Sequence, residues 1–81
     1  MAAFRDDLLH WIRYQPRLAV RVMELVEAVM REPFTGIGKP EPLRGAFAGA
    51  WSRRVDQEQR LIYMVEDTKV IFLACRGHYT S

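Results

Sequence analysis

The sequence predicts an α+β fold in which two N-terminal helices pack on a small, twisted, mainly antiparallel sheet. The chain has 81 residues and is 49% hydrophobic, so it can bury one small core, and we expect a single domain over residues 1–81. Two amphipathic stretches come first. Three short runs rich in β-branched and aromatic residues follow them, separated by polar turns. That order is typical of helices followed by an antiparallel meander.

The first helix is expected from about Arg5 to Tyr14 and the second from Pro16 to about Arg31. Pro16 interrupts the first helix because the residue before a proline disfavours helical geometry, yet proline is tolerated as the first residue of the next helix. Each stretch has apolar residues at helical spacing. These residues are Phe4, Leu8, Trp11 and Ile12 in the first stretch, and Leu18, Val22, Leu25 and Val29 in the second.

A long connection from Phe34 to Gly49 joins the helices to the meander. A loop of this length in so small a domain is usually functional or disordered. Pro40 and Pro42 restrict the backbone on both sides of Glu41, which argues against disorder and holds Glu41 extended. From these residues alone, a surface glutamate in a rigid turn explains Glu41 equally well.

Three strands are expected to begin near Trp51, Arg60 and Lys69. In the middle strand, alternation places Arg60 and Ile62 on the face opposite Leu61. Both faces of the last two strands are largely apolar. We therefore expect the helices to cover one face, and the long loop or a partner to cover part of the other.

Arginine dominates the basic residues, because only Lys39 and Lys69 of the 12 are lysines and the net charge is +2. Guanidinium groups suit bidentate contacts with phosphate and stacking on bases. Their concentration in the meander, followed by His-Tyr, indicates a polyanion site. The residues concerned are Arg53, Arg54, Arg60, Arg76, His78 and Tyr79.

A single cysteine, Cys75, excludes an internal disulfide and a cysteine-based zinc site. No metal or cofactor is expected. The sequence shows no secretory signal and no apolar run near the roughly 20 residues that span a bilayer. We therefore expect a cytoplasmic protein without membrane contact.

Several motifs occur together in the second half of the chain. They are Gly-Ile-Gly-Lys-Pro-Glu-Pro-Leu at 36–43, Trp-Ser-Arg-Arg at 51–54, Gln-Glu-Gln-Arg-Leu-Ile-Tyr at 57–63 and Ala-Cys-Arg-Gly-His-Tyr at 74–79. In these motifs, their order and their spacing, the chain resembles the YoeB (Txe/YoeB) toxins of bacterial type II toxin–antitoxin systems, within the RelE/ParE superfamily. The resemblance covers more than half of the chain.

The resemblance implies a ribosome-dependent endoribonuclease, an mRNA interferase that cleaves mRNA in the ribosomal A site by metal-independent acid–base chemistry. It implies that Glu41 is the base, Arg60 stabilises charge at phosphorus, and His78 is the acid. Tyr79 completes the implied site by stacking on the nucleotide or hydrogen-bonding to it. The residues expected to contact RNA or the ribosome are Lys39, Arg44, Arg53, Arg54 and Arg76.

The implied partners are a YefM-like antitoxin, the 70S ribosome and mRNA. A homodimer or a toxin–antitoxin hetero-oligomer is expected, with operator DNA contacted only through the antitoxin. An acidic, partly disordered antitoxin segment would cover the arginines and stabilise a domain of marginal size.

The sequence also departs from the family pattern. Family members usually open with a short strand, and Met1–Phe4 is too short to supply it, so that strand is expected to be missing. Gly77 stands where tyrosine is common, and Gln59 where many relatives have histidine. Two alternatives therefore stay open. One is a non-catalytic RelE/ParE-superfamily protein such as a gyrase inhibitor, and the other is a degenerate toxin that acts as an antitoxin-bound corepressor.

Overall fold

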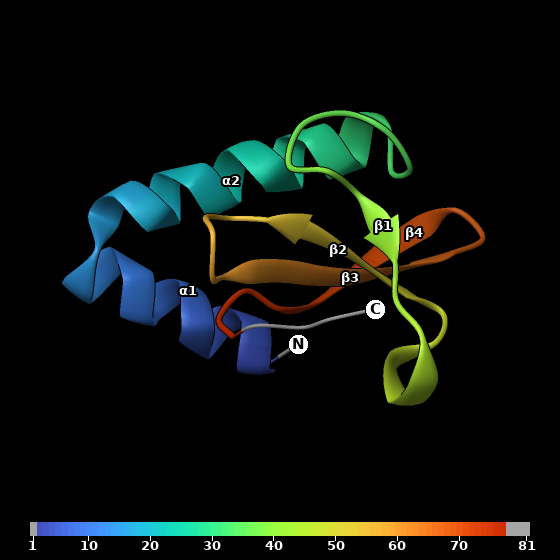
Figure 1. Cartoon of the computed structure of the whole chain (residues 1–81). Helices are drawn as coiled ribbons and strands as arrows, with labels where there is room; N and C mark the ends of the chain where they lie inside the picture. Colours follow the sequence, from blue (N-terminus) through green and yellow to red (C-terminus); the bar gives the residue numbers. More distant parts are fainter. Residues whose placement is uncertain (1, 78–81) are drawn as a thin grey trace.

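The computed structural model describes residues 2–77 and has two helices followed by a four-stranded antiparallel sheet (Figure 1). The helices are α1 (Ala2–Tyr14) and α2 (Pro16–Arg31). The strands are β1 (Glu41–Pro42), β2 (Ala50–Arg54), β3 (Arg60–Glu66) and β4 (Lys69–Ala74), with a 3-10 turn, η1 (Gly45–Phe47), between β1 and β2. The predicted α+β fold is confirmed.

Within residues 2–77, α1 is the first element and no strand precedes it. No helix in this part of the chain is long and apolar enough to cross a bilayer.

The sheet has the strand order β1-β2-β3-β4, and all three pairings are antiparallel. Glu41 pairs with Ser52, Ser52 with Ile62, and Ile62 with Ala74. Because directly paired residues point to the same side of a sheet, these four residues form one row on one face. The extended conformation expected at Glu41 therefore takes the form of a two-residue edge strand.

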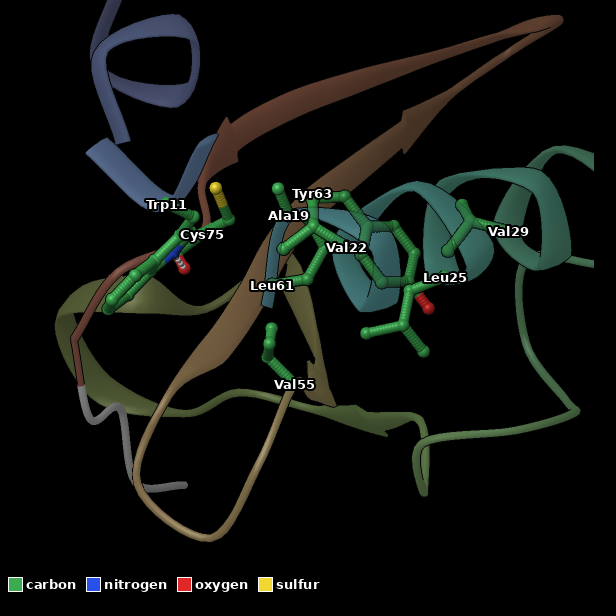
Figure 2. Packing of buried hydrophobic residues seen from close by; sticks show 9 residues of the cluster. All are labelled: Trp11, Ala19, Val22, Leu25, Val29, Val55, Leu61, Tyr63 and Cys75. Carbon is green, nitrogen blue, oxygen red and sulfur yellow. Dashed lines mark hydrogen bonds between the residues drawn. The ribbon is translucent and has the colours of Figure 1, made fainter. Parts of the chain in front are cut away.

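The main core lies between α2 and the sheet. Val22, Leu25 and Val29 of α2 are completely buried and pack with Leu61 and Tyr63 of β3 (Figure 2). The predicted stripe of α2 and the predicted alternation of β3 are confirmed at these positions. Alternation on β3 leaves Arg60 and Ile62 on the opposite face of the sheet.

The first helix begins at Ala2, earlier than the expected start near Arg5. The additional residues are helical because Phe4 packs on the core, with its ring centroid 5.5 Å from that of Phe72. Trp11 is buried as expected. Ile12 is 53% exposed, so its expected place in the core stripe was wrong. It faces away from the sheet because the helix turns about 100° between Trp11 and the next residue.

Cys75, just after β4, is fastened to α1. Its backbone N–H donates to Oδ2 of Asp7 at 3.0 Å. Its carbonyl oxygen accepts from Nε1 of Trp11 at 2.9 Å (Figure 2). The thiol lies 3.9 Å from the carbonyl oxygen of Phe4. Burial, helped by the nearby Asp7 carboxylate, raises the pKa of this thiol to about 12.

A second, smaller cluster covers part of the other sheet face. Leu43, Ala50 and Ile62 are buried there, with Met64 and Leu73 packed against them. Leu43 follows β1 directly and comes from the long connection. The expectation that this loop covers part of the face away from the helices is therefore confirmed.

Candidate active site

Glu41 and Arg60 lie on the same face of the sheet, away from the helices. Glu41 is in the row of Ser52 and Ile62, and Arg60 is two residues along β3 from Ile62. With strands about 4.8 Å apart and a rise of about 3.4 Å per residue, their Cα atoms are separated by roughly 12 Å. Two long side chains at that separation can contact opposite sides of one phosphodiester. The Glu41 side chain is exposed and accessible to such a ligand.

Arg60 is only 7% exposed, and the preceding turn holds its guanidinium. Its Nη1 donates to the carbonyl oxygens of Asp56 at 2.8 Å, Gln57 at 3.2 Å and Gln59 at 3.1 Å. The turn is itself fixed, because Oδ1 of Asp56 accepts backbone N–H groups of Glu58 and Gln59 at 2.8 and 2.6 Å. Arg60 is thus a preorganised cation rather than a freely solvated strand arginine.

The segment after β4 is tied to the start of β3 at Gly77. The backbone N–H of Arg60 donates to the carbonyl oxygen of Gly77 at 3.0 Å. The N–H of Gly77 donates to Oε1 of Gln59 at 2.6 Å. Gly77 has φ +123°, a conformation that residues with a side chain rarely adopt. The predicted catalytic residues His78 and Tyr79 follow Gly77 in the sequence and lie outside the described residues.

Four of the five residues expected to contact RNA are exposed: Lys39, Arg44, Arg54 and Arg76. Arg54 pairs with Arg60 in the β2–β3 register and lies on the face that carries Glu41. Lys39 has φ +52°, two residues before Glu41. Arg76 lines a pocket of about 310 Å³ beside α1, so the structure brings it to that helix.

Arg53 does not fit its predicted role, because its side chain is completely buried. Its guanidinium donates to backbone carbonyls between Glu32 and Ile37 and to the hydroxyl of Tyr63. A group enclosed in this way has no surface to offer to RNA. The expectation that Arg53 contacts RNA is therefore corrected: alternation along β2 turns it toward the helices, on the side opposite Arg54.

Sequence reasoning missed the part played by Gln59. The residue was noted only as a departure from a common histidine, whereas its side chain orients the backbone of Gly77 next to Arg60. No local pattern indicates this contact, because it depends on the chain returning to β3 after β4. Among residues 2–77, no group of three or more His, Cys, Asp or Glu side chains is arranged to hold a metal ion.

Comparison with known proteins identifies the family of the chain. The profile described as YoeB-like toxin of bacterial type II toxin-antitoxin system matches residues 2–79. Toxin YoeB of Mycobacterium bovis is 46% identical over 74 residues, which span 91% of this chain and 87% of the relative.

Solved structures give the same result. A YoeB/ParE toxin from Agrobacterium tumefaciens has a TM-score of 0.92 and 38% identity, over 98% of this chain and 94% of that one. The heterotetrameric YoeB-YefM toxin-antitoxin complex from Staphylococcus aureus contains a chain with a TM-score of 0.85 and 31% identity, over 94% of this chain and 88% of that one. The resemblance predicted from the sequence motifs is confirmed, and the chain belongs to the YoeB-like toxins of bacterial type II toxin–antitoxin systems.

Proposed function

We propose that this toxin is a ribosome-dependent endoribonuclease whose site combines Glu41 and Arg60 with His78 and Tyr79. The observation that carries the proposal is the placement of Glu41 and Arg60 on one sheet face, with Gly77 bonded to the Arg60 backbone. His78 follows Gly77 directly in the sequence, and we take its imidazole as the third catalytic group together with Glu41 and Arg60.

The chemistry is an attack by the ribose 2′-oxygen on the neighbouring phosphorus. Glu41 accepts the proton of the 2′-hydroxyl as the new P–O2′ bond forms, and the P–O5′ bond breaks. His78 gives its proton to the departing 5′-oxygen, so the products are a 2′,3′-cyclic phosphate and a 5′-hydroxyl. Each group handles one proton, and the charge balance needs no further reactant.

Arg60 stabilises the extra negative charge that builds up on the phosphoryl oxygens. Because the Asp56–Gln59 turn already holds its guanidinium, little reorganisation is needed at the moment of reaction. Arg54, exposed and paired with Arg60, adds a second cation on the same face. Lys39 and Arg44, exposed on either side of β1, extend this charge toward the rest of the RNA. Binding is therefore expected to weaken as salt rises.

The same exposed cations also provide a binding surface for an acidic protein partner. The related toxin of Staphylococcus aureus is described in a heterotetramer with YefM. For this chain we infer a YefM-like antitoxin in which an acidic segment covers Arg44, Arg54 and the Glu41 face, and so blocks access of RNA.

The test is cleavage of a defined mRNA on purified 70S ribosomes, with new 5′-ends mapped by primer extension. We expect cuts by the wild type on ribosomes and none on free mRNA. Glu41→Gln, Arg60→Lys and His78→Gln should each lower the cleavage rate by about 100-fold or more, while circular dichroism stays native. Arg17→Gln, an exposed change on α2, is the control and should cleave like the wild type.

Absence of new ends with soluble wild-type protein contradicts the proposal. Gyrase inhibition by the same preparation would then identify a non-catalytic relative. Unchanged cleavage by any one of the three variants removes that residue from the mechanism.

A further inference from the structure

We propose that Arg53 is a positioning residue: its buried guanidinium docks the loop between α2 and β1 and thereby sets the place of Glu41 relative to Arg60. This inference rests on the proposed function. It assigns to Arg53 a role different from the RNA contact expected from its sequence motif.

The contacts of Arg53 all lead to that loop. Its Nη2 donates to the carbonyl oxygens of Glu32 at 2.7 Å and Thr35 at 2.8 Å, and its Nη1 donates to the carbonyl of Ile37 at 3.1 Å. Both terminal nitrogens are thus occupied by backbone oxygens. One side chain thus binds three carbonyl oxygens of the six-residue segment 32–37.

The third guanidinium nitrogen, Nε, is connected to the same loop through the hydroxyl of Tyr63. Nε of Arg53 donates to the hydroxyl oxygen of Tyr63 at 3.2 Å, and that hydroxyl donates to the carbonyl of Pro33 at 2.7 Å. Tyr63 is completely buried in β3 and packs in the main core. The loop is therefore connected to the main core through Arg53 and Tyr63.

Electrostatics favour this arrangement. The charge is completely buried, and burial of a cation is costly unless its donors are satisfied. Here all three nitrogens have acceptors, and one of these, the carbonyl of the C-cap residue Glu32, lies at the C-terminal end of α2, where the helix dipole places partial negative charge. An ammonium group at this position would be a point donor, without the planar fork that serves Glu32, Thr35 and Ile37 together.

The docked loop passes directly into the site. The backbone N–H of Arg54 donates to the carbonyl of Gly38 at 2.7 Å. Gly38 lies so close to β2 and α2 that an added Cβ would be 3.2 Å from Cβ of Arg53 and 2.8 Å from Cδ2 of Leu25. Only Lys39 and Pro40 separate Gly38 from Glu41.

Strand β1 is too short and too exposed to fix its own position. It is two residues long, and Glu41 and Pro42 are both exposed. Proline at position 42 also lacks an N–H for the ladder. The position of Glu41 is therefore determined mainly by the anchored residues on either side of it, which are the Arg53-bound loop before β1 and buried Leu43 after it.

The test compares Arg53→Lys and Arg53→Ala with Val22→Ala. Val22 is also completely buried but lies on α2 in the main core, so its truncation destabilises the fold without touching the loop anchor. All proteins are assayed at a temperature where circular dichroism shows them folded. Cleavage rate and ribosome affinity are measured separately, because a positioning residue changes the rate more than the binding.

Amide hydrogen exchange gives a readout that does not depend on activity. The Arg54 amide reports on loop docking because it donates to Gly38, and the Arg60 amide is the internal control because it donates to Gly77. In Arg53→Lys we expect protection of the Arg54 amide to fall about tenfold or more relative to the Arg60 amide. In Val22→Ala the protection of the two amides should fall by the same factor.

For cleavage, we expect Arg53→Lys and Arg53→Ala to lose about 100-fold in rate while ribosome affinity changes less than about threefold. Ethylguanidinium at millimolar concentration should restore part of the rate of Arg53→Ala, and ethylurea, its neutral analogue, should not. Rescue by both compounds, or by neither, contradicts a role that depends on the buried cation.

The possible failures are distinguishable. If the wild type cuts RNA and both Arg53 variants cut within about threefold of it, only the positioning role is overturned. An equal change in the protection of the Arg54 and Arg60 amides on going from wild type to Arg53→Lys also overturns it. If the wild type makes no cut on ribosomes, the proposed function is overturned, and this inference with it.

Discussion

The backbone N–H of Arg60 donates a hydrogen bond to the carbonyl oxygen of Gly77, 3.0 Å away. This bond keeps the chain that follows β4 beside the first residue of β3, although β4 itself ends at Ala74. Gln59 secures the other side of the same glycine with its side-chain oxygen. The residue that presents the fixed guanidinium and the residue that leads to His78 are therefore neighbours in space.

Gly77→Ala tests this junction. Gly77 has φ +123°, where a Cβ is strained, so we expect unfolding free energy to fall by about 1–2 kcal/mol and cleavage to fall at least tenfold. Gly49→Ala is the matched control, since Gly49 has φ +97° and an added Cβ would meet only Cε of Met64, at 3.8 Å. Urea melts and single-turnover cleavage rates measure both variants. Equal loss of cleavage in the two proteins would assign the effect to stability alone.

Lys39→Asn separates charge from backbone strain. Lys39 has φ +52°, which asparagine tolerates better than lysine, so we expect no loss of unfolding free energy. Removing one phosphate contact should reduce the slope of log affinity against log salt by about 0.7 for single-stranded RNA. Filter binding across a salt series measures the slope. Lys69→Asn, at the exposed first position of β4, should leave the slope unchanged, and an unchanged slope in Lys39→Asn would exclude a phosphate contact at Lys39.

The raised pKa of Cys75 predicts that the free energy of unfolding declines at alkaline pH. Burial, with the Asp7 carboxylate nearby, raises the pKa of the thiol from 9.0 to about 12, so between these values the folded chain holds a proton that the unfolded chain releases. The unfolded state then binds fewer protons, and unfolding free energy falls as pH rises, by about 1.4 kcal/mol per pH unit. Cys75→Ala removes this contribution. The difference between the two proteins in denaturant melts from pH 8 to pH 11 should therefore change with pH, and a constant difference would contradict it.

The helices and the hairpin of β3 and β4 could be predicted because their signals are local. Proline marks the start of α2 at Pro16, and its apolar spacing gives the face that meets β3. The turn before Lys69 separates two β-branched runs, and the strands begin and end there as expected. The start of α1 was less predictable, because the residues before Arg5 are helical only through the packing of Phe4 on the sheet.

The candidate site residues could be proposed from the motifs, but the structure that surrounds Glu41 and Arg60 could not. The motifs pointed to Glu41 and Arg60. That the two lie on one sheet face follows from the register of β1 with β2, and this register could not be predicted because β1 is only two exposed residues long. The sequence did contain a signal for the burial of Arg53. In an extended strand it shares a face with Trp51 and Val55, two residues to either side, and both of these pack with the main core. The usual exposure of arginine outweighed that signal. Only the three-dimensional structure shows the carbonyls that satisfy it.

The hydrogen bond from Trp11 to Cys75 spans 64 positions of the sequence, and that from Arg60 reaches forward to Gly77. A nascent chain that has been synthesised only to residue 70 can form α1, α2 and β2 but lacks both connections. Contacts of such long sequence separation form late in folding. The anchoring of the segment that leads to His78 is therefore completed only after the rest of the sheet has been synthesised, and any activity that depends on it arises after that point.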